Sequence, residues 1–167
     1  MKESEFNYEE WLKSVPNSLT GDPLWRMKVY CLALFVANLG WHDVTKLSKD
    51  RRTWKLSDQL YAALGSTGAN ISEGYSRSSG KDRVRLYEYA LGSARESRTW
   101  YFNGRHMLGN EIAFHRMRLL THIIRLLLQT IPEERTRMIR DAEVPYRVNI
   151  SNENAENLLN AVPLPAP

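Results

Sequence analysis

Apolar side chains recur every three or four residues in four long segments of the chain, which is the spacing of one face of an α-helix. These segments span residues 23–39, 52–73, 81–108 and 111–131. We find no convincing stretch of the strict apolar–polar alternation that predicts a half-buried β-strand. The pattern therefore predicts an all-α protein.

Glycine and proline mark the expected ends of these helices. Asp22 can cap the first helix, and Pro23 suits its first turn, where the missing N–H is not needed. Gly40 is expected to stop that helix, Gly109-Asn110 to separate the third from the fourth, and Pro132 to end the fourth. Four helices joined by such short links are typical of an antiparallel, up-and-down four-helix bundle.

Three regions follow from these boundaries. Residues 23–131 form the predicted bundle, and residues 1–22 precede it as an extension with one short helix around residues 8–12. Residues 132–167 form an acidic tail that ends in Ala-Val-Pro-Leu-Pro-Ala-Pro. Because proline cannot continue a helix, we expect the end of this tail to be extended or disordered.

The predicted helices carry apolar faces of different widths. The face of the second helix consists of Leu60, Leu64, Thr67 and Ile71. The fourth helix has two adjacent apolar stripes, namely Ala113, Met117, Leu120, Ile124, Leu127 and Ile131, and beside them Ile112, Leu119, Ile123 and Leu126. So wide an apolar arc exceeds what one bundle groove needs, so we expect this helix to serve both the core and a contact between copies of the chain.

The turn after the second helix has two interpretations. Gly74 is expected to take the left-handed cap conformation, with Asn70, Glu73 and Arg77 tying the turn to the third helix by hydrogen bonds. The alternative is a binding site built from the same polar residues. We favour the structural interpretation. In the third helix, the small residues Ser93, Ser97 and Gly104 are expected to let a neighbouring helix approach closely.

Composition narrows the class of protein. Hydrophobic residues make up 43% and charged residues 25%, as in soluble globular proteins. No apolar stretch reaches the ~20 residues that a membrane-spanning helix needs, and the first residues lack the apolar segment of a secretory signal. The single cysteine, Cys31, excludes an internal disulfide and falls on an apolar helix face. We therefore expect a reduced, cytoplasmic protein with no membrane association.

Charge is distributed unevenly along the chain. Residues 23–131 hold 17 basic and 8 acidic side chains, whereas both flanking regions are net negative. A basic body with acidic ends suggests a polyanionic partner such as RNA or DNA, or ends that fold back on the body. The candidate nucleic-acid-binding residues lie on the third and fourth helices: Arg95, Arg98, Arg105, Arg116, Arg118 and Arg125. Simple solubility is an equal alternative for these arginines.

Catalytic and metal chemistry find little support in the sequence. A di-iron site in a helical bundle needs Glu-x-x-His motifs, and the chain has none. Glu111 and His115 are expected to form an exposed pair on the surface of the fourth helix. The chain also lacks a phosphate-binding loop and a dinucleotide fingerprint, and its histidines do not sit in a glycine-flanked nucleophile context. We therefore expect no catalytic residues, no metal and no cofactor.

Four ordered sequence blocks resemble a known family. Lys-Val-Tyr-Cys-Leu-Ala-Leu (28–34), Lys-Leu-Ser-Asp-Gln-Leu (55–60), Asn-Ile-Ser-Glu-Gly-Tyr-Ser-Arg-Ser-Ser (70–79) and Ala-Leu-Gly-Ser-Ala-Arg-Glu (90–96) are similar to the four-helix-bundle proteins encoded by intervening sequences of bacterial 23S ribosomal RNA genes. The family pattern falls on Gln59, Asn70, Ile71, Glu73, Gly74, Arg77, Gly92, Ser93 and Glu96. The resemblance covers residues 24–130. It departs from the family at Leu60-Tyr61-Ala62 and at Ser97-Arg98.

The resemblance carries its own expectations. It implies a four-helix protomer that assembles into a barrel-like homopentamer without known catalytic activity. It also implies kinship with the accessory variability protein of diversity-generating retroelements, a basic pentamer that binds a reverse transcriptase and its RNA. The resulting hypothesis is a non-catalytic, nucleic-acid-binding accessory subunit. The alternative is an oligomeric protein-interaction scaffold whose arginines form salt bridges between protomers.

Overall fold

The computed structural model describes residues 7–138, 159–160 and 162–165. Within these ranges every regular element is a helix, so the all-α prediction is confirmed. Much of the predicted tail, including residues 139–158, lies outside the described residues. The expectation that part of this tail is disordered is therefore a prediction that the described residues do not test.

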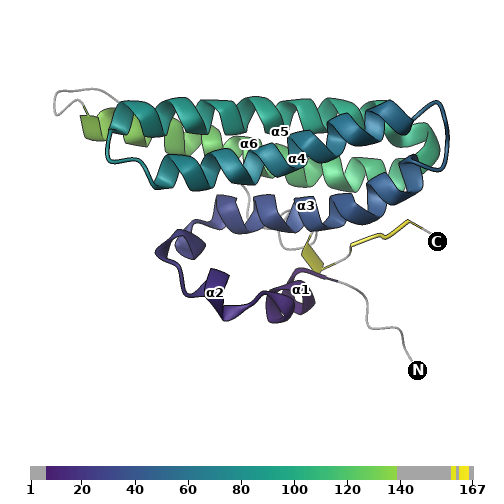
Figure 1. The fold of residues 1–167 in the computed structure, drawn as a ribbon, viewed down its shortest axis with the longest axis horizontal. Helices are drawn as coiled ribbons and strands as arrows, with labels where there is room; N and C mark the ends of the chain where they lie inside the picture. Colours follow the sequence, from purple (N-terminus) through teal and green to yellow (C-terminus); the bar gives the residue numbers. More distant parts are fainter. Residues whose placement is uncertain (1–6, 139–158, 161, 166–167) are drawn as a thin grey trace.

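Four long helices lie side by side, and the shorter N-terminal helices lie against one of them (Figure 1). We call the four long helices the helical body. The elements in chain order are α1 (Tyr8–Ser14), α2 (Asn17–Thr20), the 3-10 helix η1 (Pro23–Arg26), α3 (Lys28–Leu47), α4 (Trp54–Tyr75), α5 (Gly80–Leu108) and α6 (Asn110–Met138).

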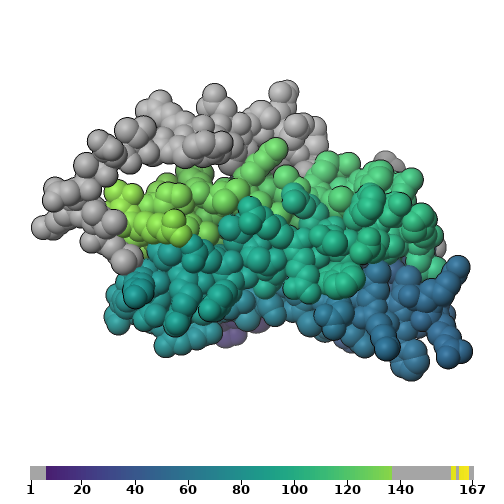
Figure 2. Space-filling view, turned by 90° about the horizontal axis from the view of Figure 1, so that it is seen from above, coloured from purple at the N-terminus to yellow at the C-terminus, as the bar shows by residue number. Residues whose placement is uncertain are grey.

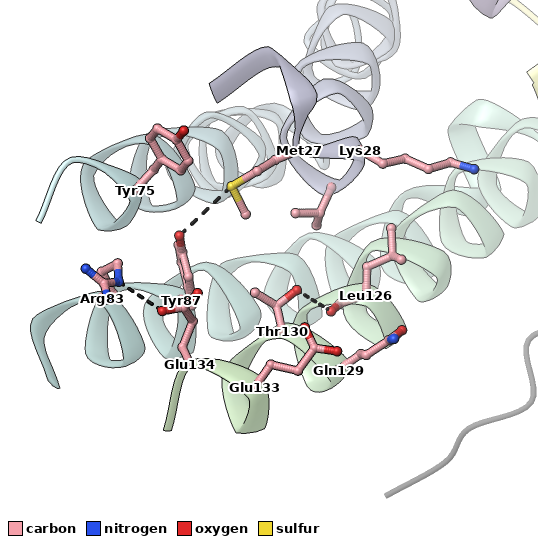
Figure 3. Close-up of a pocket in the computed structure, with 11 residues that line it drawn as sticks. Met27, Lys28, Tyr75, Arg83, Tyr87, Leu126, Gln129, Thr130, Glu133 and Glu134 are labelled. Atoms are coloured by element: carbon pink, nitrogen blue, oxygen red, sulfur yellow. Dashed lines mark hydrogen bonds and ion pairs between the residues drawn. The ribbon is translucent and has the colours of Figure 1, made fainter. Parts of the chain in front are cut away.

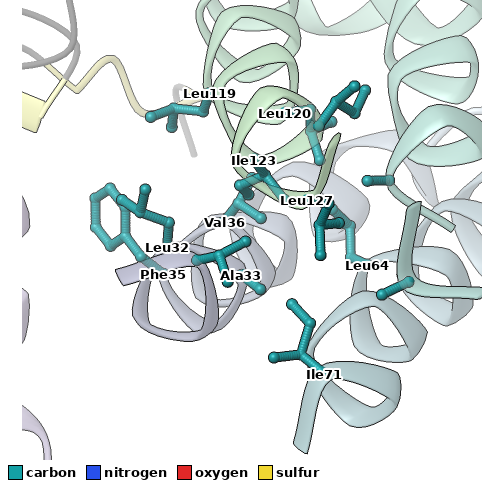
Figure 4. Close-up of a cluster of buried hydrophobic side chains, with 14 of the residues drawn as sticks. Leu32, Ala33, Phe35, Val36, Leu64, Ile71, Leu119, Leu120, Ile123 and Leu127 are labelled. Carbon is teal, nitrogen blue, oxygen red and sulfur yellow. The ribbon is translucent and has the colours of Figure 1, made fainter. Parts of the chain in front are cut away.

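The core fills the space between the long helices, as the apolar spacing predicted. The predicted face of α4, from Leu60 to Ile71, is fully buried. Figure 4 shows side chains of α3, α4 and α6 meeting in this core. Both predicted stripes of α6 point into the chain, and even Ile112 and Leu119 of the second stripe are less than a tenth exposed. The width of the α6 arc is thus used within one chain and gives no reason to expect a contact between copies.

The predicted ends of the first long helix were wrong. Asp22 does cap a helix, because its Oδ1 accepts a hydrogen bond from the Leu24 N–H at 2.8 Å, but that helix is the short η1. Gly40 lies inside α3 rather than after it. A Cβ at Gly40 would clash with the Leu64 Cδ1 atom. The glycine therefore permits the close approach of α4, and the helix continues through it to Leu47.

Pro132 does not end α6, contrary to the prediction, because the helix runs on to Met138. Two ion pairs join the last turns of α6 to α5. Arg83 Nε donates to Glu134 Oε2 at 3.0 Å, and Arg135 pairs with Glu88. These contacts help to hold the helix beyond a residue that cannot supply a backbone N–H.

The N-terminal residues pack on the body through aromatic rings. Trp11 of α1 is only 7% exposed, and its ring centroid lies 5.2 Å from that of Phe35 on α3. Tyr8 meets the same Phe35 ring edge-on at 5.1 Å, and burial raises the pKa of Tyr8 to about 12. Cys31 is buried beside this cluster, as expected, and its Sγ donates to the Trp25 carbonyl at 3.0 Å.

Candidate nucleic-acid interface

Helices α5 and α6 form a hairpin whose two arms run in opposite directions. The turn is made at Gly109, whose φ of 92° falls in the region that favours glycine. Arg98 Nη1 donates to Thr121 Oγ1 at 3.2 Å, and nearer the open end Arg83 reaches Glu134. Residues that are far apart in the sequence thus contact each other at two levels of the hairpin. Figure 2 views the molecule from the side on which this hairpin lies uppermost.

The hairpin gathers five of the six predicted arginines on one face. Arg118 and Arg125 precede and follow Thr121 by three and four residues, so all three share one side of α6. Arg98 reaches Thr121 from α5, which brings the two helices' arginines together. We call the following set the arginine face: Arg95, Arg98, Arg105, Arg118 and Arg125. Arg95, Arg118 and Arg125 are exposed, and the other two are partly buried.

The arginine face lacks neutralising acids among the described residues. Between Glu111 and Glu133, α6 carries no carboxylate at all. On α5, Glu96 is the only acid between Glu88 and the helix end, and its Oε1 accepts from Trp100 Nε1 at 3.1 Å. None of the five arginines forms an ion pair with a described carboxylate. Their positive charges are therefore available to an external anion.

Two exposed phenylalanines accompany the arginines. Phe102 is 46% exposed on α5 and Phe114 is 39% exposed on α6. The Arg105 guanidinium lies 4.0 Å from the Phe102 ring centroid and donates to the Phe102 carbonyl at 2.6 Å. Exposed aromatic rings beside arginines can stack on unpaired bases while the arginines contact phosphates.

His122 adds a titratable group at the edge of this face. It is partly buried, and no partner for its Nε2 occurs among the described residues. Burial lowers its pKa, and the positive charges of Lys28 and Arg125 lower it further. Both effects favour the neutral form of the imidazole.

Arg116 does not belong to the arginine face, which corrects the sequence-based set. Its side chain is fully buried, so it cannot contact a phosphate. Nε donates to Asp43 Oδ2 at 2.8 Å, and Nη2 donates to Asp43 Oδ1 at 3.2 Å. Asp43 is equally buried on α3, and the two charges neutralise each other inside the helical body.

The buried pair is the centre of a larger polar network. Tyr101 Oη on α5 donates to Asp43 Oδ2 at 2.8 Å, and burial together with the Asp43 charge raises the pKa of Tyr101 well above its usual value. Arg116 Nη1 lies 2.9 Å from His115 Nδ1, which must accept because a guanidinium only donates. His115 is only 3% exposed, so the expected surface pair with Glu111 was wrong.

The turn motif after α4 also differs from its predicted geometry. Gly74 lies inside α4 without a positive φ, and a Cβ there would meet Tyr87 Cε1 at 2.7 Å. Arg77 pairs with Glu73, and Asn70 Nδ2 donates to the Ser66 carbonyl at 2.8 Å, so both bonds stay on the α4 side of the turn. The connection to α5 comes instead from Arg83, whose Nη1 donates to the carbonyls of residues 77 and 78.

Among the other residues that carried the resemblance, Ile71 is buried in the core and Gly92 is exposed. Gln59 and Glu96 are exposed on α4 and α5. The Ser93 carbonyl accepts from Ser97 Oγ at 2.9 Å, and Ser97 is fully buried. Gly104 is buried, and a Cβ there would lie 3.2 Å from Leu47 Cδ2. The expected close approach of a neighbouring helix is therefore observed at Gly104.

A pocket of about 590 Å³ opens where α3 and α5 begin and where α4 and α6 end. Figure 3 shows its lining, which comprises Met27, Lys28, Val29, Tyr75, Arg83, Tyr87, Leu126, Gln129, Thr130, Glu133 and Glu134. Arg83 is paired with Glu134, and the other two charged lining residues, Lys28 and Glu133, carry opposite charges. The pocket is therefore nearly neutral and does not extend the arginine face.

Two further site classes can be considered for the described part of the chain. No group of three or more His, Cys, Asp or Glu side chains there is arranged to hold a metal ion. No helix of that part is long and apolar enough to cross a membrane.

The part of the chain that contains the long helices matches a known protein family. The model of the 23S rRNA-intervening sequence protein family matches residues 26–129. The chain belongs to this family. A crystal structure of a protein of unknown function from the S23 ribosomal protein family of Bacteroides thetaiotaomicron matches with a TM-score of 0.58 and 24% identity, covering 62% of this chain and 97% of that one. No curated protein matches the chain.

The family match covers one part of the described chain and leaves other parts outside it. The matched residues include the arginine face, Asp43 and Arg116. They exclude α1, the last turns of α6 and residues 159–165. The structure also adds residues that the sequence pattern missed, above all Asp43. Its pairing with Arg116 spans 73 positions, and a lone aspartate in a polar stretch gives no signal of such a contact.

Proposed function

We propose that this protein is a non-catalytic, nucleic-acid-binding accessory subunit of the cytoplasm, with RNA as its preferred ligand. The observation that carries the proposal is the arginine face, five arginines on the α5–α6 hairpin with no described carboxylate paired to them. A cationic surface whose arginines have no paired carboxylate attracts a phosphate backbone, and solvated surfaces usually mix both signs of charge.

The aromatic rings favour single-stranded over double-stranded ligands. Phe102 and Phe114 are exposed beside the arginines. In a duplex the faces of the bases are stacked on each other, whereas unpaired bases can stack on such rings. This favours single-stranded RNA or the loops of a folded RNA.

Assembly is the second part of the proposal. The helical body serves as an antiparallel four-helix protomer of a ring or barrel-like homo-oligomer, with a pentamer as the arrangement that the family resemblance implies. The contact between copies is supported by exposed aromatic residues away from the arginine face. Trp41 on α3 is 60% exposed, Tyr61 on α4 is 45% exposed, and their ring centroids are 6.2 Å apart. Trp54 is 62% exposed at the start of α4.

The same resemblance supports a protein partner. Kinship with the accessory variability protein of diversity-generating retroelements makes a reverse transcriptase the partner to test. A ring would repeat the arginine face around its circumference and so offer one RNA several equivalent contacts.

The alternative is an oligomeric scaffold that binds no nucleic acid. Trp41, Tyr61 and Trp54 favour it, because exposed aromatic side chains are typical of protein interfaces. In that case the arginines pair with acids of other protomers or with the acidic ends of the chain.

Binding of single-stranded RNA at several salt concentrations tests the proposal. A phosphate-binding face gives an affinity that falls steeply as the salt concentration rises. Binding releases counterions from the RNA, and this release is less favourable at high salt. A scaffold shows no binding even at low salt. Light scattering on the same samples tests assembly, and a mass near the 19.4 kDa of one chain would exclude the homo-oligomer.

A further inference from the structure

The C-terminal residues 162–165 lie over the buried Arg116 centre. Arg116 Nη2 donates to the Pro163 carbonyl at 2.7 Å, although the two residues are 47 positions apart. Val162 and Leu159 pack against the core cluster. Figure 4 shows Leu119, which lies one turn after Arg116 on α6, extending toward this segment.

The chemistry of the site selects a carbonyl group. Asp43 and His115 together accept three hydrogen bonds from the Arg116 guanidinium. Nη2 has a second N–H, which is left to donate to a further acceptor. A buried guanidinium has no acceptor of its own, so an unpaired N–H there is costly. A peptide that binds at this site must therefore place one carbonyl oxygen against Arg116 Nη2.

The segment has the matching chemistry. Its sequence, Val-Pro-Leu-Pro, is apolar, and its two prolines carry no backbone N–H. An extended segment with few donors can lie on an apolar surface without leaving N–H groups unsatisfied. Val162 and Pro163 are partly buried, whereas the Leu164 side chain is 41% exposed. The site therefore recognises the segment through the side chains of Val162 and Pro163 and through the Pro163 carbonyl.

We propose that the surface over Arg116 is a peptide-binding site for a short, extended, apolar segment containing proline, and that residues 162–165 of this chain are its resident ligand. The segment and the site belong to the same covalent chain. This connection gives the segment a high local concentration at the site, so a small contact suffices to keep the site occupied. A partner that presents the same kind of segment displaces the chain's own end and gains the site.

A labelled peptide and two matched variants of the full chain test this proposal. The probe is a fluorescent peptide of residues 157–167, and binding is followed by anisotropy. Val162→Asp places a charge at the packed position and frees the site, while Leu164→Asp adds the same charge at the exposed position and leaves the site occupied. Val162→Ser is the milder version in case the charged variant folds poorly.

The expected result is a difference between the chains. A tethered competitor at about 1 mM weakens a peptide with a Kd of about 0.1 mM by about tenfold. The peptide should therefore bind the Val162 variants about tenfold more tightly than it binds the wild-type or Leu164→Asp chain. A peptide carrying Val162→Asp should not bind. Equal binding to all chains, or binding to none of the folded chains, overturns the proposal.

Discussion

At the scale of single residues, the structure distinguishes arginines that sequence alone cannot distinguish. Arg116 and Arg118 lie two positions apart on α6, yet one is fully buried and the other is exposed. The buried one neutralises Asp43 and holds α3 to α6, and the exposed one has no described acidic partner. The first is expected to affect stability and the second binding.

Removing the Arg116 charge should destabilise the fold strongly. Arg116→Met keeps much of the side-chain volume but leaves the Asp43 carboxylate buried without its counter-ion, which typically costs about 3–5 kcal/mol. Urea denaturation measures this loss. The matched variant, Asp43→Leu combined with Arg116→Met, removes both charges and should recover much of the stability. Equal stability of the wild type and Arg116→Met would contradict the buried pair.

His122 should make stability depend on pH. Its pKa in the folded chain is lowered below the ordinary 6.5 by burial and by the positive charges of Lys28 and Arg125. As pH falls through 6.5, the unfolded chain binds a proton that the folded chain refuses, so the unfolding free energy decreases. Between pH 7.5 and 5.5 this decrease should be larger for the wild type than for His122→Asn. The same decrease in both proteins would show that His122 is not responsible.

At the scale of helices, the apolar spacing predicted the faces well, whereas glycine and proline predicted the ends unevenly. The predicted break at Gly109-Asn110 is confirmed, because α5 ends at Leu108 and α6 begins at Asn110. Leu60, Leu64 and Ile71 are fully buried because a repeat near 3.6 residues keeps one side of a helix on the core. Gly40 and Pro132 were expected to stop helices, but contacts with distant residues decide otherwise. Those contacts cannot be seen in a local pattern, which is also why Asp43 was missed.

Two glycines of α4 should respond oppositely to alanine. A Cβ at Gly74 would lie 2.7 Å from Tyr87 Cε1, so Gly74→Ala should overpack the α4–α5 contact and cost about 1–3 kcal/mol. A Cβ at Gly65 meets nothing within 4 Å, so Gly65→Ala should stabilise the helix by up to about 1 kcal/mol. Thermal unfolding of both variants measures the difference. A destabilised Gly65→Ala would show that this open surface of α4 is covered in solution.

At the scale of the whole molecule, the arginine face and the exposed side chains of Trp41, Trp54 and Tyr61 lie on different pairs of helices. The α5–α6 hairpin carries the arginine face, while Trp41, Trp54 and Tyr61 are exposed on α3 and α4. The proposed RNA contact and the proposed contact between copies therefore use different helices. A substitution on the hairpin can reduce nucleic-acid binding without dissolving the oligomer.

That separation is tested most directly by a charge reversal on α6. Arg118→Glu with Arg125→Glu reverses two exposed charges of the arginine face, and Arg51→Glu with Lys55→Glu makes the same change in net charge before and at the start of α4. Single-stranded RNA binding is measured for both against salt, with light scattering on the same samples. We expect the α6 variant to keep its oligomeric state, to bind RNA about tenfold or more weakly, and to lose about two from the salt slope. The control should bind nearly as the wild type does. An α6 variant that binds RNA like the control, or that falls apart into monomers, would contradict the arginine face as the nucleic-acid interface.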